Sequence, residues 1–211
     1  MRTDDLIAQL ASEPPAASLN LPRVAAGFLV AVTVPVAAFL LFAGVRAGLG
    51  AVLINPVTLM KTLLPALTAG LALTGVLRLM RPEGQTGLIM VALAIPLIGG
   101  LGLLGYTIAT MPPAGWFAEW TALGIIECTG LTLMLSAAPA IAALRLFRRG
   151  ASPAPRRSAM LAGIAAGAAA STGYSFFCTQ DNPMFFVIWY GASIAIVTLV
   201  TLHYGRKQFA W

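Results

Sequence analysis

Six long apolar runs are the feature that most constrains the fold of this chain. They cover residues 24–45, 63–79, 87–108, 121–144, 159–177 and 184–202. An α-helix needs about 20 apolar residues to cross the hydrocarbon core of a bilayer. The runs are apolar throughout, whereas the strands of a membrane barrel alternate polar and apolar residues. We therefore expect an all-α membrane protein, a polytopic bundle of six transmembrane helices in the lipid bilayer.

The composition leaves no room for a further folded domain. Of the 211 residues, 59% are hydrophobic and only 9% are charged, which is far from the composition of a soluble domain. We divide the chain into a cytoplasmic tail with a short amphipathic helix (1–23), the six-helix domain (24–204) and a second cytoplasmic tail (205–211). The first tail is acidic and the first run is long, so we expect this span to be retained rather than cleaved as a signal peptide.

The basic residues predict the orientation in the membrane. Eleven of the thirteen Lys and Arg residues lie in the two tails and in the second and fourth connections, and the others are Arg46 and Lys61. Because positively charged connections are retained in the cytoplasm, we expect an inner-membrane protein of a bacterium with both termini in the cytoplasm. The net charge of +6 then reflects topology, and we expect no direct binding of nucleic acid.

Prolines and small residues within the runs predict local geometry and packing. Kinks are expected at Pro35, Pro96 and Pro139. Small residues recur every four positions in the second and fifth runs, where they let another backbone approach. These residues are Ala66, Gly70 and Thr74, and Ala159, Gly163, Gly167 and Ser171. We expect them to pack within one chain, and the oligomeric state is left open.

Two cysteines lie toward the periplasmic side in this topology. Cys128 is in the fourth run near its outer end, and Cys178 follows the fifth run. Three interpretations stay open at this point. The pair is a structural disulfide, a reactive thiol pair that senses oxidants or soft metals, or two unrelated buried cysteines.

Glu127 is the one clearly ionisable residue deep within a run, where a charge is costly. It is either functional, or it is protonated or paired with Lys61 or Arg46 and fixes the helix register. Asp181 is a second acidic residue near the cysteines. The candidate ligands for a soft or borderline metal ion are Cys128, Cys178, Glu127 and Asp181. Motifs for phosphate binding, dinucleotide binding or hydrolysis do not occur, so we expect neither enzymatic activity nor a cofactor.

The start of the first tail has the pattern of a short docking helix. A capping residue and two acidic residues precede an apolar stripe, and two prolines follow it. Such a helix fits a groove on a partner protein or lies on the membrane surface. The residues concerned are Thr3, Asp4, Asp5, Leu6, Ile7 and Leu10.

Three parts of the chain resemble one protein family. They are residues 1–7 (MRTDDLI), Cys128, and residues 178–183 (CTQDNP) with the Phe185, Trp189 and Tyr190 that follow. They are similar to the negative regulators of sigma-F, which are six-span membrane anti-sigma factors. The resemblance extends over nearly the whole chain.

The resemblance implies a protein that holds an extracytoplasmic-function sigma factor at the inner membrane. Release would follow heavy-metal or oxidative stress, so a heavy-metal ion or an oxidant would be the signal. By position and motif, Cys128 and Cys178 correspond to the two cysteines that are tied to the response in this family. The segment from Thr3 to Leu6 is the candidate for sigma-factor contact.

Two other classes of function remain as alternatives. A small-molecule or ion transporter, or a channel, would also use six helices, but it needs a polar path across the bilayer. Glu127 alone provides too few polar groups for such a path. A scaffold protein would use the docking tail without needing the cysteines.

Overall fold

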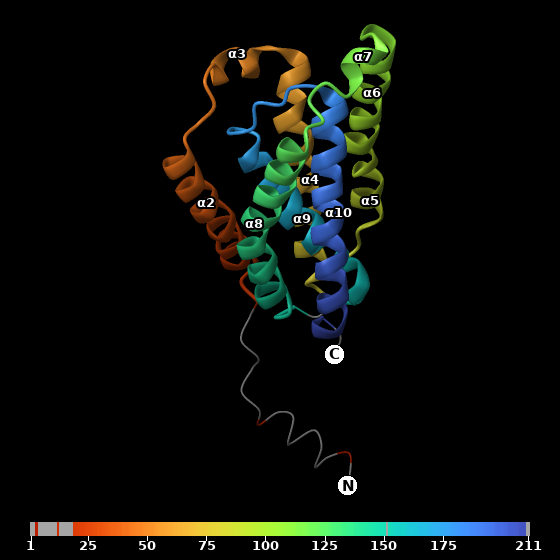
Figure 1. The fold of residues 1–211 in the computed structure, drawn as a ribbon. Coiled ribbons are helices and arrows are strands. Elements are labelled where there is room, and N and C mark those ends of the chain that lie inside the picture. The colour runs from red at the N-terminus through yellow and green to blue at the C-terminus, as the bar shows by residue number, and fades with distance from the viewer. Residues whose placement is uncertain (1–2, 4–11, 13–18, 151, 210–211) are drawn as a thin grey trace.

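The computed structural model describes residues 3, 12, 19–150 and 152–209, and helices joined by short connections make up the secondary structure in these ranges (Figure 1). The helices are, in chain order, α2 (Leu21–Ala43), α3 (Leu49–Ile54), α4 (Pro56–Leu79), α5 (Gly87–Ala92), α6 (Ala94–Thr110), α7 (Pro113–Trp116), α8 (Ala122–Phe147), α9 (Pro155–Tyr174) and α10 (Pro183–Gln208). The predicted all-α class is confirmed.

Within the described ranges, five segments are long and apolar enough to cross a membrane, so the protein is a multi-pass membrane protein. They are Leu21–Ala43, Pro56–Leu79, Gly87–Thr110, Ala122–Phe147 and Pro183–Gly205. Large apolar side chains on their outer faces are exposed, including Phe42 and Leu88, as expected of a surface that faces lipid. The predicted run 159–177 falls on α9, which is not among the five.

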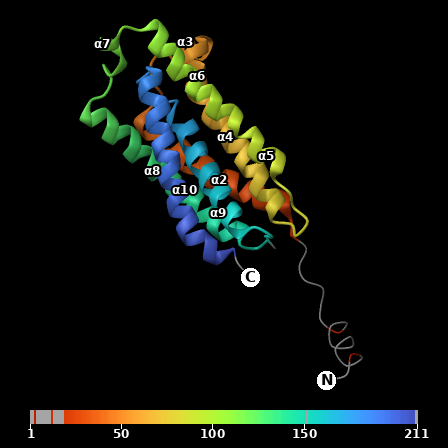
Figure 2. The ribbon, with the colours of Figure 1, turned by 90° about the vertical axis from the view of Figure 1, so that its right-hand side faces the viewer.

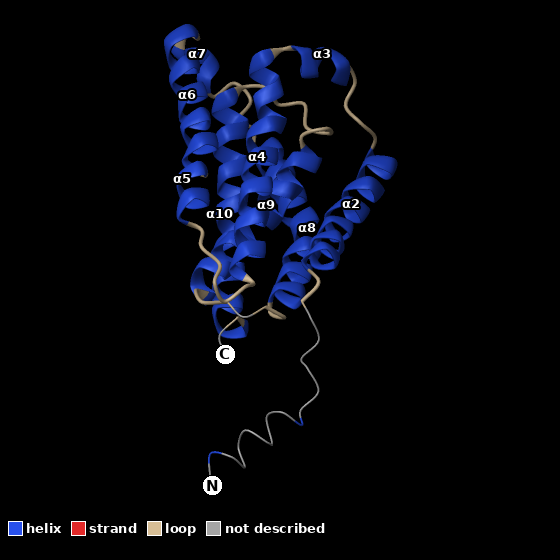
Figure 3. Cartoon of the chain, turned by 180° about the vertical axis from the view of Figure 1, so that it is seen from behind, coloured by secondary structure: helices blue, strands red, loops and turns tan. Residues whose placement is uncertain are grey.

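Helix α9 forms the centre of the bundle. It packs against α4, α8 and α10 and also meets α2, and the view from behind places it among these helices (Figure 3). The pair α5 and α6 runs along the side of the bundle next to α4 (Figure 2). Most of the α9 side chains are small and buried, among them Ala162, Ala166 and Ala170. Small residues allow neighbouring helices to approach the central one closely.

The small-residue stripe of α9 faces α10. A Cβ atom on Gly163 would lie 2.6 Å from the Cα of Thr198, and one on Gly167 would lie 3.0 Å from the Cα of Ile194. The predicted packing of this stripe within the chain is confirmed. The same prediction for the α4 stripe is wrong, because Gly70 and Thr74 are exposed and nothing lies within 4 Å of a Cβ added at Gly70.

A break at Leu93 separates α5 from α6. Pro96 lies three residues further on and has no N–H to donate to the carbonyl of Ala92, which is the partner that a continuous helix would require. The helix is therefore interrupted close to Pro96, the position at which a kink was predicted. Pro35 and Pro139 lie inside uninterrupted helices, and kinks there stay predictions.

The first residues of α2 and the last of α10 lie at the same end of the bundle (Figure 1). The connections before α5 and before α9 are at this end too. Helices α3 and α7 mark the opposite end, where the connection between α9 and α10 also lies. Of the predicted docking helix, Thr3 is exposed, and Asp4, Asp5, Leu6, Ile7 and Leu10 lie outside the described residues.

Substitution of Gly163 by Ala tests the close packing of α9 on α10. The added methyl group would overlap the α10 backbone, so we expect Gly163→Ala to lower the free energy of unfolding in detergent by about 1–3 kcal/mol. Gly70→Ala is the matched control, since it makes the same change on an open helix surface, and it should be neutral or stabilising by up to about 1 kcal/mol. Equal stability of the two variants would contradict the packing described here.

Candidate functional site

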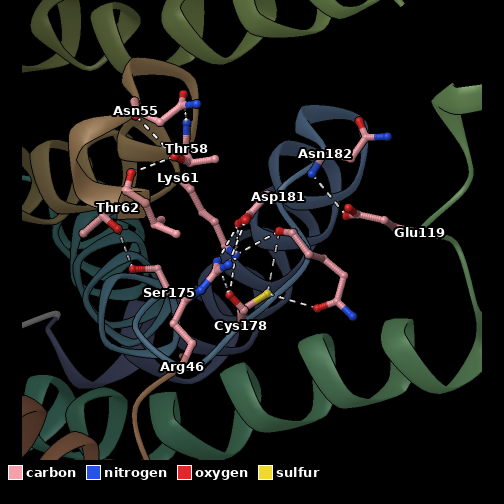
Figure 4. A network of polar contacts seen from close by, with 12 residues as sticks. Arg46, Asn55, Thr58, Lys61, Thr62, Glu119, Ser175, Cys178, Asp181 and Asn182 are labelled. Atoms are coloured by element: carbon pink, nitrogen blue, oxygen red, sulfur yellow. Dashed lines mark hydrogen bonds and ion pairs between the residues drawn. The ribbon is translucent and has the colours of Figure 1, made fainter. Parts of the chain in front are cut away.

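The connection between α9 and α10, residues 175–182, forms the candidate site and is called the site loop below (Figure 4). Asn182 ends this loop, because its side chain accepts a hydrogen bond from the N–H of Met184 at 3.0 Å and caps α10. Its Nδ2 donates to the carbonyl of Gly115 at 3.0 Å, and its backbone N–H donates to Oε2 of Glu119 at 3.1 Å. The site loop is thereby fastened to the α7 region.

Two buried cations hold the other part of the site loop. The guanidinium of Arg46 binds both carboxylate oxygens of Asp181, at 2.6 and 2.8 Å, and donates to the carbonyl of Cys178 at 2.9 Å. The Lys61 ammonium donates to the carbonyls of Cys178 at 2.7 Å and Gln180 at 2.8 Å, and it lies 3.3 Å from Asp181. Arg46, Lys61 and Asp181 form what we call the ion cluster.

The ion cluster stabilises the charged form of Asp181. Burial of the carboxyl group opposes its ionisation, but the hydrogen bond from Arg46 and the charge of Lys61 outweigh this effect and lower the pKa of Asp181 below its usual value. The same hydrogen bond raises the pKa of Arg46. One carboxylate and several carbonyl oxygens thus compensate two buried positive charges.

We predicted an ion pair of Glu127 with Lys61 or Arg46 as one alternative. This is wrong, because both cations bind Asp181 instead. Arg46 and Lys61 were also missed as site residues. Their signal was present in the sequence, because they are the two basic residues outside the basic tails and connections. In the structure both of them bind Asp181, which is the single acidic residue of the site loop.

Cys128 and Cys178 are brought together in one buried cluster, and both are free thiols. Cys128 is on α8, and Cys178 is in the site loop, where its Sγ lies 3.3 Å from Oε1 of Gln180. The pKa of Cys178 is lowered to about 6, chiefly by a hydrogen bond from the Cys128 thiol; burial acts in the opposite direction, and the charge of Lys61 favours the thiolate. The two cysteines are neighbours without a disulfide.

A small cavity of about 160 Å³ with mixed polar and apolar walls lies beside Cys178 and is called the thiol pocket below. Arg46, Glu127, Thr179 and Gln180 line it together with Cys178. Glu127 is half-buried, and no ion pair involves it among the described residues. The pocket gives Glu127 a polar environment close to the thiols.

The four candidate metal ligands are not gathered into one cluster. Nowhere in the described ranges do three or more His, Cys, Asp or Glu residues converge on a position where they could hold a metal ion. Asp181 is occupied by Arg46 and Lys61. Binding of a metal by Cys128, Cys178, Glu127 and Asp181 stays a prediction, and it would require Asp181 to leave the ion cluster.

A second cavity, of about 560 Å³, lies between α4, α6, α9 and α10. Its walls are almost entirely apolar, and Lys61, Thr68, Tyr190 and Thr198 are the polar residues among those that line it. A path for a polar solute requires a series of polar groups across the bilayer. This cavity does not supply one.

Comparisons with known proteins relate the chain to one family. The sequence profile of a family described as "Negative regulator of sigma F" matches residues 10–211. A protein of Azospira oryzae named "Probable anti-sigma-F factor NrsF" is 29% identical over 220 aligned positions, which cover the whole of both chains. No solved structure matches.

Neutralising Asp181 tests the importance of the ion cluster. Asp181→Asn would leave two buried cations without their carboxylate, so we expect the free energy of unfolding in detergent to fall by about 3 kcal/mol. Glu83→Gln is the matched control, because Glu83 is exposed at the opposite end of the bundle, and its effect should stay within about 0.5 kcal/mol. A loss for Asp181→Asn no larger than for the control would show that the ion cluster does not stabilise the fold.

Proposed function

The chain belongs to the family of negative regulators of sigma F, and from this premise we propose how it binds and releases its partner. As a member, it is a membrane anti-sigma factor and not an enzyme. We propose that it sequesters an extracytoplasmic-function sigma factor at the bacterial inner membrane and releases it under heavy-metal or oxidative stress. Cys128 and Cys178 sense the stress in this proposal. The observation that carries it is that two free thiols share one buried cluster, while the ion cluster binds the backbone carbonyl of Cys178.

The connections of the site loop support a path from the thiols to the helices. The carbonyl of Cys178 binds Arg46, which precedes α3, and Lys61, which is on α4. Cys128 is part of α8. A disulfide or a shared metal ion would pull Cys178 toward α8 and change the position of the carbonyl that both cations bind. The thiol chemistry would therefore act on three separate helical elements at once.

The energy required is of a suitable size. Changing the occupancy of the sigma factor from about 99% to about 1% needs a shift of roughly 5.5 kcal/mol in the binding equilibrium. Disruption of a buried ion pair typically costs about 3–5 kcal/mol. Disturbance of the ion cluster together with some helix repacking would account for the difference. A single exposed contact would not.

We infer that α9 also spans the membrane, as the fifth of six spans in chain order, and that both termini are cytoplasmic. With 20 residues, α9 is about 30 Å long. Helices α8 and α10 both run toward the end where α10 finishes (Figure 1), so α9 has to return across the bundle to connect them. The basic residues around the connections before α5 and before α9 lie at that end, which favours its placement in the cytoplasm. They are Arg78 and Arg81, and Arg145, Arg148, Arg149, Arg156 and Arg157.

The sigma factor would dock on the first tail. Thr3, Asp4, Asp5, Leu6, Ile7 and Leu10 form the proposed contact, which rests on their amphipathic pattern. The tail precedes α2 at the end of the bundle assigned to the cytoplasm. The signal site and the docking segment would then lie on opposite sides of the membrane, and the helices would connect them.

Reporter insertions test the topology. Alkaline phosphatase needs disulfides and becomes active only outside the cytoplasm. We expect an inactive reporter when it is inserted after Gly150, before α9, and an active one when it is inserted after Thr179, after α9. Inactivity at both positions, with normal amounts of the fusion protein, would contradict a membrane crossing by α9.

Capture of a sigma factor tests the proposed function. The detergent-solubilised protein should co-purify with one sigma factor from unstressed cells, and deletion of residues 1–11 should abolish this. Replacement of residues 13–18 by a Gly-Ser linker is the control and should retain binding. Capture that survives the deletion would move the contact elsewhere, and no capture by the intact protein would contradict the anti-sigma proposal.

The same complex tests the cysteines. Treatment with an oxidant or with cadmium should release the sigma factor from the intact protein, whereas Cys128→Ser and Cys178→Ser should keep it bound. Equal release from all three proteins would exclude the sensing role of the pair.

A further inference from the structure

A buried donor that the fold does not use belongs to one of the residues that line the thiol pocket. The Arg46 side chain is only 9% exposed, and its two terminal nitrogens are occupied by Asp181 and the Cys178 carbonyl. Its Nε has no hydrogen-bond acceptor among the described residues. Buried donors are nearly always satisfied. Arg46 also lines the thiol pocket, so a ligand atom that accepts from this N–H would enter from that cavity.

The charges around the pocket favour a small neutral ligand. Arg46 is already neutralised by Asp181, and Glu127 lines the same cavity. An anion would lie close to an acidic residue, and a cation would lie close to Arg46. The volume of about 160 Å³ holds a molecule of only a few heavy atoms. The remaining requirement is an oxygen that can accept from Nε beside the sulfur of Cys178.

The two cysteines differ in their access to this position. Cys178 lines the thiol pocket, whereas Cys128 does not and is completely buried. A ligand in the pocket therefore meets Cys178 first. Cys128 belongs to the same buried cluster and supplies a second thiol behind it.

We propose that the thiol pocket binds a small hydroperoxide, that Cys178 is the thiol it oxidises, and that Arg46 Nε orients the peroxide. This rests on the proposed sensing function and names its oxidant and the order of its steps. For hydrogen peroxide, the Cys178 sulfur attacks one oxygen, an S–O bond forms and the O–O bond breaks. The leaving oxygen takes the thiol proton and departs as water, which leaves a sulfenic acid on Cys178.

The second step joins the cysteines. The Cys128 sulfur attacks the Cys178 sulfur, an S–S bond forms and the S–O bond breaks. The hydroxyl group leaves as water with the Cys128 proton. Two thiols are oxidised to one disulfide, and the peroxide is reduced to two molecules of water. Arg46 Nε contributes by donating to the oxygen on which negative charge develops.

Sulfenic acid trapping tests this order of events. The purified full-length protein is treated with hydrogen peroxide and dimedone, and the adducts are located by mass spectrometry. We expect an adduct on Cys178 in Cys128→Ser, none on Cys128 in Cys178→Ser, and a disulfide in the unmodified chain. A dimedone adduct on Cys128, or none on either cysteine, would overturn the proposal.

Arg46→Lys tests the role of Nε. Lysine keeps a cation for Asp181 but has no Nε–H at this position, so the rate of Cys178 oxidation by hydrogen peroxide should fall about 10- to 100-fold. Alkylation of Cys178 by N-ethylmaleimide reports access and should change by less than twofold. Arg81→Lys, at the exposed opposite end, is the control. An unchanged oxidation rate, or a parallel fall in both reactions, would remove the orienting role.

The outcome is separable from that of the proposed function. Trapping and alkylation need no sigma factor, and sigma-factor capture needs no peroxide. Failure of the peroxide chemistry with intact capture and cadmium release would refute the inference alone. Failure of capture with intact peroxide chemistry would refute the anti-sigma proposal alone.

Discussion

The burial of the Lys61 ammonium is the constraint on which the rest of this end of the molecule depends. An ammonium group at 1% exposure is tolerable only when its three donors are satisfied and its charge is compensated. The acceptors are two carbonyls and a carboxylate of one short loop, so the loop has to adopt this conformation for α4 to pack. Arg46 reinforces the same conformation from another element. The position of Cys178 against Cys128 therefore follows from a requirement of charge burial and needs no disulfide.

The bundle is organised around a helix that is less hydrophobic than its neighbours. Helix α9 consists largely of Ala, Gly and Ser, and its faces are covered by α4, α8, α10 and α2. A central helix does not need large apolar side chains to face lipid, and small side chains let the neighbouring helix backbones approach it closely. The outer helices carry the exposed Leu, Ile, Val and Phe residues instead. In this bundle the least hydrophobic helix therefore has the most central position.

Much of the fold was predictable from the sequence, and the site was predictable in part. Five of the predicted spans correspond to long apolar helices, because the cost of exposing backbone to lipid is a local property of each run. The proximity of Cys128 and Cys178 agrees with their predicted depth. The pairing of Arg46 and Lys61 with Asp181 was missed because it joins residues more than 100 positions apart. The packing predicted for the small residues of α4 was wrong for a related reason, since residue size along one helix does not reveal whether another helix packs against it.

The composition of α9 also bears on how the chain is made. A segment with so many Gly, Ala and Ser residues is a weak substrate for insertion when judged by hydrophobicity alone. In the six-span arrangement proposed above, the newly synthesised protein has to retain this segment in the membrane until α10 emerges from the ribosome, since the α10 backbone packs against Gly163 and Gly167. Helix α10 would then complete the core. Truncated or stalled chains that lack α10 would leave α9 uncovered and available to membrane proteases.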